Sequence, residues 1–141
     1  MQLEADRTVF EAGLDAAERE VLSMHSFWTD KPIVVAAPEE LADPDPLLRR
    51  TFRESGHICF LTVGGKENRA WPIRSGSTAW EAAGTIHTDM QKGFIRAEVI
   101  SYADFSQAGG EVQAKRAGKQ RLEVKDYVMQ DFDVVNFRFS R

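Results

Sequence analysis

Five basic side chains gather in a short stretch toward the C-terminal end of the sequence, with a single acidic residue, Glu123, among them. Clustered cations displace counterions from nucleic-acid phosphates, so the stretch is a candidate surface for RNA. The alternative is a solvated charged face near a helix end, and the acidic isoelectric point of about 5.4 counts against a dedicated nucleic-acid binder. The five residues are Lys115, Arg116, Lys119, Arg121 and Lys125.

Two further groups of side chains have the types found in catalytic or metal sites. His87 and Asp89 lie close together, with Lys92 just beyond, as a ligand pocket or a proton relay would require. The alternative is a loop that caps a helix end, and it is favoured because nothing nearby completes a catalytic set. His57 and Cys59 alternate on one predicted strand face, but two ligands without a CxxC or HxxxH pattern do not make a zinc site. The sequence therefore predicts no catalytic residue, metal or cofactor, and no small-molecule substrate.

A loop that cradles nucleotide phosphates would have a recognisable pattern. It requires an upstream glycine, a lysine for the terminal phosphates, and Ser or Thr directly after that lysine. The nearest candidates are residues 65–67 (GKE) and 118–120 (GKQ), and neither has the upstream glycine at the right spacing or the hydroxyl residue after its lysine. The chain is therefore expected not to be an enzyme of nucleotide hydrolysis.

The composition is that of a folded domain in a reducing compartment. Hydrophobic residues make up 43% and charged residues 28%, and the nine Phe, three Trp and two Tyr argue against disorder. No apolar run approaches membrane-spanning length, and the acidic, amphipathic N-terminus does not resemble a signal or transit peptide. The single cysteine excludes an internal disulfide framework. These features predict a cytoplasmic protein without a membrane partner.

The net charge of −4 is unevenly distributed along the chain. Residues 1–64 carry six Lys and Arg against twelve Asp and Glu, whereas residues 65–141 carry twelve against ten. Only the second part can present a basic face to an anionic partner.

The first part of the chain is predicted to be mostly helical. Residues 3–28 carry an apolar heptad stripe, interrupted at Arg7, which predicts a helix that packs along a partner helix like a coiled coil; the alternative is an amphipathic helix on its own domain. The apolar run Ile33–Ala37, ended by Pro38, predicts one buried strand. A second helix is expected from Asp45-Pro46 to Gly56.

From residue 57 onward the pattern is that of a mixed sheet. A turn at Gly64-Gly65 joins the first two strands, and a capping box formed by Thr78 and Glu81 begins a helix that buries Ala79, Ala82, Ala83 and Ile86. Short helical pieces at 102–107 and 111–117 form an irregular crossover. This order predicts an α+β fold, a ubiquitin-like β-grasp domain at 57–141, with a helical appendage and one short strand at 1–56. The predicted strands are 57–63, 67–73, 94–102, 126–130 and 134–140.

The tryptophans are candidates for base stacking in an RNA-binding protein. Trp71 and Trp80 are nevertheless expected to be core or domain-edge side chains, because no basic residues interleave with Trp80 in the sequence.

Three ordered motifs stand out in residues 60–141: RAW at Arg69–Trp71, the long string from Ala82 to Phe105 that contains IHTD and KGFIRAEVI, and Ala114–Ser140. With these motifs, residues 60–141 resemble the TGS domain of the YchF/Obg-like ATPase family. The resemblance implies a β-grasp module that contacts RNA, the ribosome or a protein partner in translation-linked regulation. The residues that it marks as the family signature are Arg69, Trp71, His87, Asp89, Lys92, Arg96 and Glu98.

The first part of the chain resembles a shortened form of the same family. Residues 29–32 (TDKP) match the Thr-x-Lys-Pro motif of the family's nucleotide-binding domain, but residues 36–40 (AAPEE) lack the Asn of its adenine motif. A hydrolase of ATP or GTP is therefore the disfavoured alternative. In the family the heptad helix packs on a partner helix of the same chain. The resemblance implies that this partner helix is missing here, so a homodimer through residues 3–28 is expected to cover the apolar stripe. Val124 and Phe132 stand where the family usually has glycine, and Phe132 is expected to remodel its turn.

Overall fold

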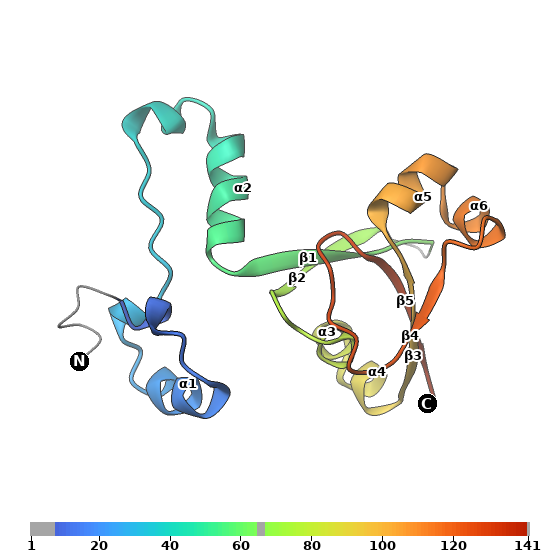
Figure 1. Cartoon of the computed structure of the whole chain (residues 1–141), viewed down its shortest axis with the longest axis horizontal. Coiled ribbons are helices and arrows are strands. Elements are labelled where there is room, and N and C mark those ends of the chain that lie inside the picture. Colours follow the sequence, from blue (N-terminus) through green and yellow to red (C-terminus); the bar gives the residue numbers. More distant parts are fainter. Residues whose placement is uncertain (1–7, 65–66, 141) are drawn as a thin grey trace. The chain divides into compact units, whose positions relative to one another are not determined.

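The computed structural model describes residues 8–64 and 67–140. The chain divides into two compact units, Met1–Ser55 and Gly56–Arg141 (Figure 1). None of the helices within the described residues is long and apolar enough to cross a membrane.

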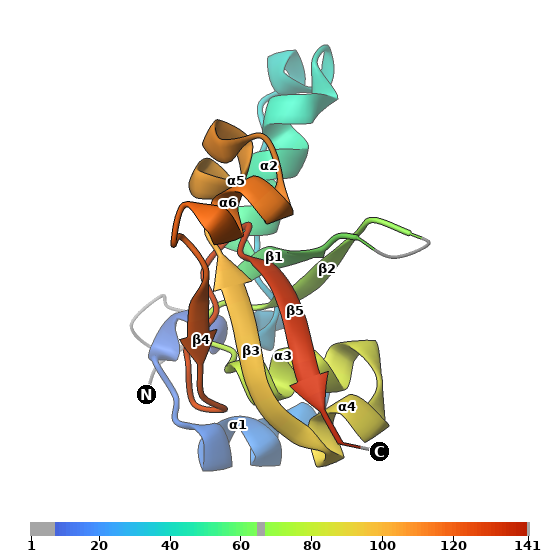
Figure 2. The ribbon, with the colours of Figure 1, turned by 90° about the vertical axis from the view of Figure 1, so that its right-hand side faces the viewer.

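The second unit is built on a five-stranded mixed sheet with the order β2-β1-β5-β3-β4 (Figure 2). The central strands β1 and β5 are parallel, and every other neighbouring pair is antiparallel. This order confirms the predicted α+β class and β-grasp topology. The strands are β1 (His57–Thr62), β2 (Arg69–Arg74), β3 (Phe94–Ile100), β4 (Arg121–Glu123) and β5 (Val134–Phe139).

Helix α3 (Ala79–Ile86) begins at the predicted capping box. The backbone N–H of Glu81 donates to Thr78 Oγ1 at 3.3 Å, and the N–H of Thr78 donates to Glu81 Oε2 at 2.7 Å. This reciprocal pair satisfies backbone donors that the first turn of a helix leaves free. Three shorter helices follow, α4 (Thr88–Lys92), α5 (Tyr102–Ala108) and α6 (Glu111–Arg116), and the last two are the predicted crossover pieces.

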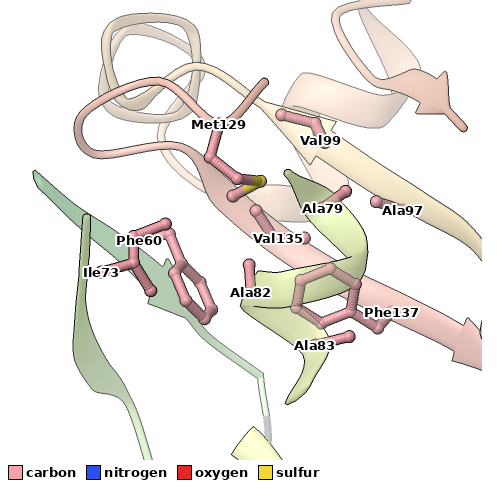
Figure 3. Packing of buried hydrophobic residues seen from close by; sticks show 10 residues of the cluster. All are labelled: Phe60, Ile73, Ala79, Ala82, Ala83, Ala97, Val99, Met129, Val135 and Phe137. Atoms are coloured by element: carbon pink, nitrogen blue, oxygen red, sulfur yellow. The ribbon is translucent and has the colours of Figure 1, made fainter. Parts of the chain in front are cut away.

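The main core lies between α3 and one face of the sheet (Figure 3). Ala79, Ala82 and Ala83 are completely buried, as the sequence predicted. Their small side chains allow α3 to approach the sheet closely, so the aromatic rings of the strands fill the space beside the helix. Phe60 and Phe137 meet edge to face with ring centroids 5.9 Å apart, a favourable geometry for aromatic pairs.

A smaller core covers part of the opposite face. Ile100 and Val134 are the strand neighbours of Val99 and Val135, and successive side chains of a strand point to opposite faces. Helices α5 and α6 cover this second cluster with Phe105 and Ala114, which leaves the remainder of that face open.

The predicted strand at 126–130 is wrong. The fourth strand of the sheet is β4, and residues 126–130 form turns with one isolated bridge between Val128 and Thr78. The backbone carbonyls of this segment and of Lys125 before it bind the start of α3. The N–H groups of Ala79 and Trp80 donate to the carbonyls of Tyr127 and Lys125 at 2.8 and 3.1 Å. The segment therefore caps the first turn of α3 instead of extending the sheet.

Phe132 has a backbone conformation of the kind that glycine favours, and its expected effect on the turn stays a prediction. Its φ of 61° lies in the left-handed region that favours glycine, and its N–H donates to the carbonyl of Cys59 at 2.7 Å. The ring packs against Tyr102 with centroids 6.2 Å apart, a contact that glycine could not make.

The predicted continuous helix over residues 3–28 is also wrong. Residues 3–7 lie outside the described part, and the rest divides into a 3-10 turn η2 (Phe10–Ala12), α1 (Ala16–Ser23) and a second turn η3 (Trp28–Asp30). Gly13 adopts a left-handed φ of 67°, which ends the first turn. Asp15 then caps α1 by accepting the N–H of Glu18 at 2.9 Å. A helix broken in this way presents no continuous heptad stripe, so the predicted coiled-coil homodimer loses its basis.

The predicted strand at Ile33–Ala37 is extended but belongs to no strand among the described residues. Ile33 and Val35 are 68% and 80% exposed. A short turn η4 (Pro38–Leu41) follows, and the predicted second helix is α2 (Pro44–Glu54). It begins with Pro44 as its first residue, whereas the sequence predicted Pro46 in that position. Over residues 8–55 this unit therefore contains helices and turns, and its apolar segment pairs with no strand there.

Candidate nucleic-acid interface

The predicted basic stretch does not form one free cationic surface. Lys115 Nζ lies 2.7 Å from a carboxylate oxygen of Glu111 and 3.6 Å from one of Glu98. The hydrogen bond to Glu111 raises the pKa of Lys115. Lys119 Nζ lies 3.1 Å from Asp104. These two lysines are neutralised by acidic residues of α5, α6 and β3, which weakens their attraction for an anionic partner.

Arg121 is likewise held by neighbouring groups. Its guanidinium lies 3.4 Å from Glu123 and 3.8 Å from the buried carboxylate of Asp133, and it donates to the Tyr127 hydroxyl at 3.0 Å. Tyr127 in turn donates to Asp133 at 2.8 Å. Burial and this bond to Asp133 raise the pKa of Tyr127 to about 12. Arg121 therefore stabilises the domain where the segment after β4 packs on the sheet.

Arg116 and Lys125 remain without an ion pair among the residues that the structure describes, and both are exposed. Arg116 stands alone at the end of α6. Lys125 lies beside two cations that the basic stretch does not contain, and this second grouping is the stronger candidate site.

A hollow of about 440 Å³, here called the Trp80 hollow, lies between α3, α4, β3 and the segment after β4. The cations Lys92, Arg96 and Lys125 line it, and none of them is ion-paired among the described residues. The indole of Trp80 is 44% exposed there. The lining consists of Trp80, Gln91, Lys92, Phe94, Ile95, Arg96, Val124, Lys125 and Asp126.

Two backbone features place these side chains. The register between β3 and β5 shifts between Phe94 and Arg96, so Ile95 has no partner residue and both it and Arg96 are exposed. Directly before the shift, the carbonyl of Gly93 accepts the N–H of Ser140 at 2.9 Å, and a Cβ at Gly93 would clash with the Ser140 carbonyl oxygen. Glycine thus allows the turn between α4 and β3, which joins Lys92 to the strand of Arg96, to lie against the backbone after β5.

The hollow combines the two features that single-stranded nucleic acid requires. An exposed indole offers a face for base stacking, and unpaired cations around it attract phosphates. Trp80 lies at the edge of the domain, and basic residues that do not interleave with it in the sequence border it in the fold, from α4, β3 and the segment after β4. No pattern in the sequence brings these segments together. Only the fold reveals the grouping.

His87 and Asp89 form a helix cap, which agrees with the favoured alternative. The N–H of Asp89 donates to His87 Nδ1 at 3.1 Å, so the imidazole caps the first turn of α4. Both side chains are largely exposed, and the described residues contain no group of three or more His, Cys, Asp or Glu that could hold a metal.

Three other signature residues, Arg69, Trp71 and Glu98, stabilise the sheet. Glu98 is only 5% exposed and accepts from Arg138 Nε at 2.6 Å and from Asn136 Nδ2 at 3.1 Å. Burial alone would raise the pKa of Glu98, but these bonds outweigh it and lower the pKa. Trp71 donates to Thr62 Oγ1 at 3.0 Å, and the Arg69 guanidinium lies 4.2 Å from the centre of its ring. Trp71 is thus the core-edge aromatic that the sequence predicted.

The sheet order, the alanine-faced helix and the short crossover helices define a ubiquitin-like β-grasp domain. The family model YchF-GTPase_C, described as "Protein of unknown function (DUF933)", matches residues 57–140, and the chain belongs to this family. The resemblance to the C-terminal domain of the YchF/Obg-like ATPases is therefore confirmed.

Individual relatives agree with this assignment. "Ribosome-binding ATPase YchF" of Haemophilus influenzae is 51% identical over 106 residues, which cover 72% of this chain and 29% of that protein. "Obg-like ATPase 1" of Gallus gallus is 49% identical over 81 residues, 57% of this chain and 20% of that protein. The structure of the Schizosaccharomyces pombe YchF GTPase superposes with a TM-score of 0.63 at 29% identity, covering 73% of this chain and 30% of that one. The chain thus spans less than a third of the length of these relatives.

Proposed function

We propose that this chain is a non-catalytic binding module that contacts ribosomal RNA through the Trp80 hollow, in translation-linked regulation. The observation that carries the proposal is the grouping of three unpaired cations around an exposed indole. The bacterial relatives that match most of this chain are named ribosome-binding proteins, which supports the choice of partner. A ribosomal partner also fits the predicted cytoplasmic location.

The chemistry of the hollow suits an unpaired nucleotide better than a duplex. One base stacked on Trp80 would contribute about 1–3 kcal/mol, independently of which base it is. Lys92, Arg96 and Lys125 would each neutralise a phosphate, which lowers the logarithm of affinity by about 0.7 per contact for each decade of salt concentration. The proposal therefore predicts weak sequence preference and strong salt dependence.

Nucleotide hydrolysis remains the disfavoured alternative. The relatives are named ATPases and a GTPase, but they match this chain over less than a third of their length. The 141 residues contain no glycine-rich loop with lysine and a following Ser or Thr, which is the motif that holds the terminal phosphates of a nucleotide.

The test is co-sedimentation of the purified chain with ribosomes over a salt series, together with binding to a labelled single-stranded RNA. A variant with Lys92→Glu, Arg96→Glu and Lys125→Glu is compared with one of equal charge change, Arg49→Glu, Arg53→Glu and Arg74→Glu. All three control residues are exposed and have no ion pair in the described part of the chain. Loss of binding in the first variant alone supports the proposal. Equal loss in both variants would show a nonspecific charge effect, and no binding by the natural chain at low salt would refute the translation role.

A further inference from the structure

One edge of the central strand β5 is left largely open. β5 pairs with β3 from Val134 to Phe139, but it pairs with β1 only where Val134 faces Leu61. Beyond that point the β1–β2 hairpin turns away from β5 (Figure 2). In the described part of the chain, no strand pairs with this edge of β5 after Val134.

The open edge has backbone groups available for hydrogen bonding. The N–H of Leu61 donates to the carbonyl of Asp133, which places the backbone groups of Asp133 on the β1 side. Because these groups alternate along a strand, Phe137 and Phe139 also direct their N–H and C=O groups to that side. Such a row of groups is a template for an added strand.

An apolar groove runs beside this edge on the α3 side of the sheet. Ile86 and Met90 of the helical layer and Phe139 of β5 line two adjoining hollows of about 990 and 290 Å³. An added strand would therefore gain backbone hydrogen bonds from β5 and bury alternate side chains against these three residues.

The first unit contains a segment with the complementary properties. Ile33–Ala37 is extended, consists of β-branched residues and alanine, and pairs with no strand in the described residues. Pro32 and Pro38 bound it and limit any strand to these five residues, which equals the length of the open edge, Val135–Phe139. Its two large exposed side chains are Ile33 and Val35, which would share one face of a strand because they are two residues apart, whereas Val34 is half-buried.

We propose that the open edge of β5 binds the Ile33–Ala37 segment of a second copy of this chain. Ile33 and Val35 would occupy the groove at Ile86, Met90 and Phe139. The main-chain groups of Val34 and Ala36 would pair with β5. The carbonyl of Val35, which already accepts from Arg50 at 3.1 Å, would face away from it.

The exchange is reciprocal, because each copy carries one segment and one edge. Two chains related by a two-fold axis would make both pairings at once, and the second pairing would form within the complex. Lys92 borders both the larger of these two hollows and the Trp80 hollow, but Ile86, Met90 and Phe139 do not line the Trp80 hollow. The variants of the following test leave Lys92, Arg96 and Lys125 unchanged, so its outcome is distinguishable from that of RNA binding.

The test is sedimentation equilibrium of the full chain over a concentration series, with Val35→Asp compared with Leu48→Asp. Val35 and Leu48 are both exposed apolar residues of the first unit, at 80% and 63%. A carboxylate buried in an apolar groove is strongly disfavoured, so Val35→Asp should raise the dimer dissociation constant at least about tenfold, and Leu48→Asp should leave it unchanged. Circular dichroism and thermal melting establish that both variants fold.

Amide hydrogen exchange then locates the contact. The N–H groups of Phe137 and Phe139 should exchange slowly in the concentrated natural chain, and faster on dilution or in Val35→Asp. A synthetic peptide of residues 31–38 should slow them again in that variant. A chain that stays monomeric at every concentration, a dimer that both variants weaken equally, or exchange at these two amides that is independent of concentration would each overturn the proposal.

Discussion

Two groups of cations lie on the same β-grasp domain and differ in whether carboxylates reach them. Around the open sheet face and the crossover helices, Lys115, Lys119 and Arg138 each contact an acidic side chain. At the Trp80 hollow, Lys92, Arg96 and Lys125 have no ion pair among the described residues. The side-chain types are the same in both places, yet only the second group is free to neutralise phosphates. Pairing, more than the number of charges, therefore distinguishes a binding surface from a structural one.

The largest expected effect comes from removing the buried acid of the paired group. Glu98→Gln would keep the shape of the side chain but abolish the charge that binds Arg138 and holds Lys115 nearby. Because hydrogen bonds to charged groups are the stronger ones, the free energy of unfolding should fall by about 2–3 kcal/mol. Urea denaturation measures this loss.

The same variant tests the comparison directly. With Glu98 neutral, Arg138 and Lys115 become less compensated, so a variant that still folds should bind single-stranded RNA more tightly at low salt. Asn136→Ala is the matched control, because it removes one hydrogen bond to Glu98 and leaves the charges unchanged. Unchanged affinity in Glu98→Gln would show that the paired cations are too constrained to act as a surface even when released.

The paired group also shows why the sequence predicted the fold better than the site. The capping box at Thr78, the alanine face of α3 and the strand alternation are local patterns, and each correctly predicted its element. The acids that neutralise Lys115 and Lys119 include Glu98 and Asp104, which precede them on other elements. Ion pairs between distant segments depend on how the chain packs. The basic stretch in the sequence therefore predicted more cations without an ion pair than the folded domain has.

The Trp80 hollow was missed for the same reason. Its cations come from α4, β3 and the segment after β4, and the shift in register at Ile95 cannot be foreseen from the alternation of strand residues. In the first unit the error was local. The apolar residues do recur with heptad spacing, but Gly13 and the cap at Asp15 divide the predicted helix. Helix start and stop signals set the ends of a helix even where the apolar periodicity continues past them.

The next effect separates the two tryptophans. Trp80→Ala removes an exposed stacking surface and should weaken RNA binding by about 1–3 kcal/mol, while the unfolding free energy changes little. Trp71→Phe is the control, because Trp71 stacks on Phe60 and bonds Thr62 at the core edge. That variant should lower thermal stability and leave RNA affinity unchanged. Fluorescence anisotropy with labelled RNA and thermal melting distinguish the two. If Trp71→Phe reduces RNA affinity more than Trp80→Ala, stacking at the hollow is refuted.

A comparable separation is expected for two glycines, Gly93 between two residues that line the hollow and Gly76 outside its lining. Gly93→Ala places a Cβ against the backbone carbonyl of Ser140, whereas the Cβ of Gly76→Ala would meet no atom within 4 Å, although its φ is 89°. Gly76→Ala therefore measures backbone strain alone, and Gly93→Ala measures a clash that pushes the α4–β3 turn away from the backbone after β5. Gly93→Ala should destabilise the domain by more than the roughly 1–2 kcal/mol of left-handed strain, and it should weaken RNA binding as well. Equal stability in the two variants would mean that the α4–β3 turn relaxes without disturbing the hollow.

The smallest effect concerns the Arg121 cluster and appears only in alkaline solution. Burial and the hydrogen bond to Asp133 raise the pKa of Tyr127 from its ordinary value of 10.0 to about 12. The folded state therefore retains the phenolic proton more strongly than the unfolded state does. This contribution to stability is complete below pH 10 and disappears as the pH rises from 10 toward 12.

Tyr127→Phe cannot lose a proton, so its unfolding free energy should fall less steeply than that of the natural chain across that interval, although it starts lower because the bond to Asp133 is absent. Urea denaturation at several pH values from 8 to 11.5 measures both slopes, and the difference between them isolates Tyr127 from the lysines, which titrate in both proteins. Parallel slopes would show that the phenol is ionised as easily in the folded domain as in the unfolded chain, and that Arg121 compensates its charge in the way that the unpaired cations of the Trp80 hollow are proposed to compensate a phosphate.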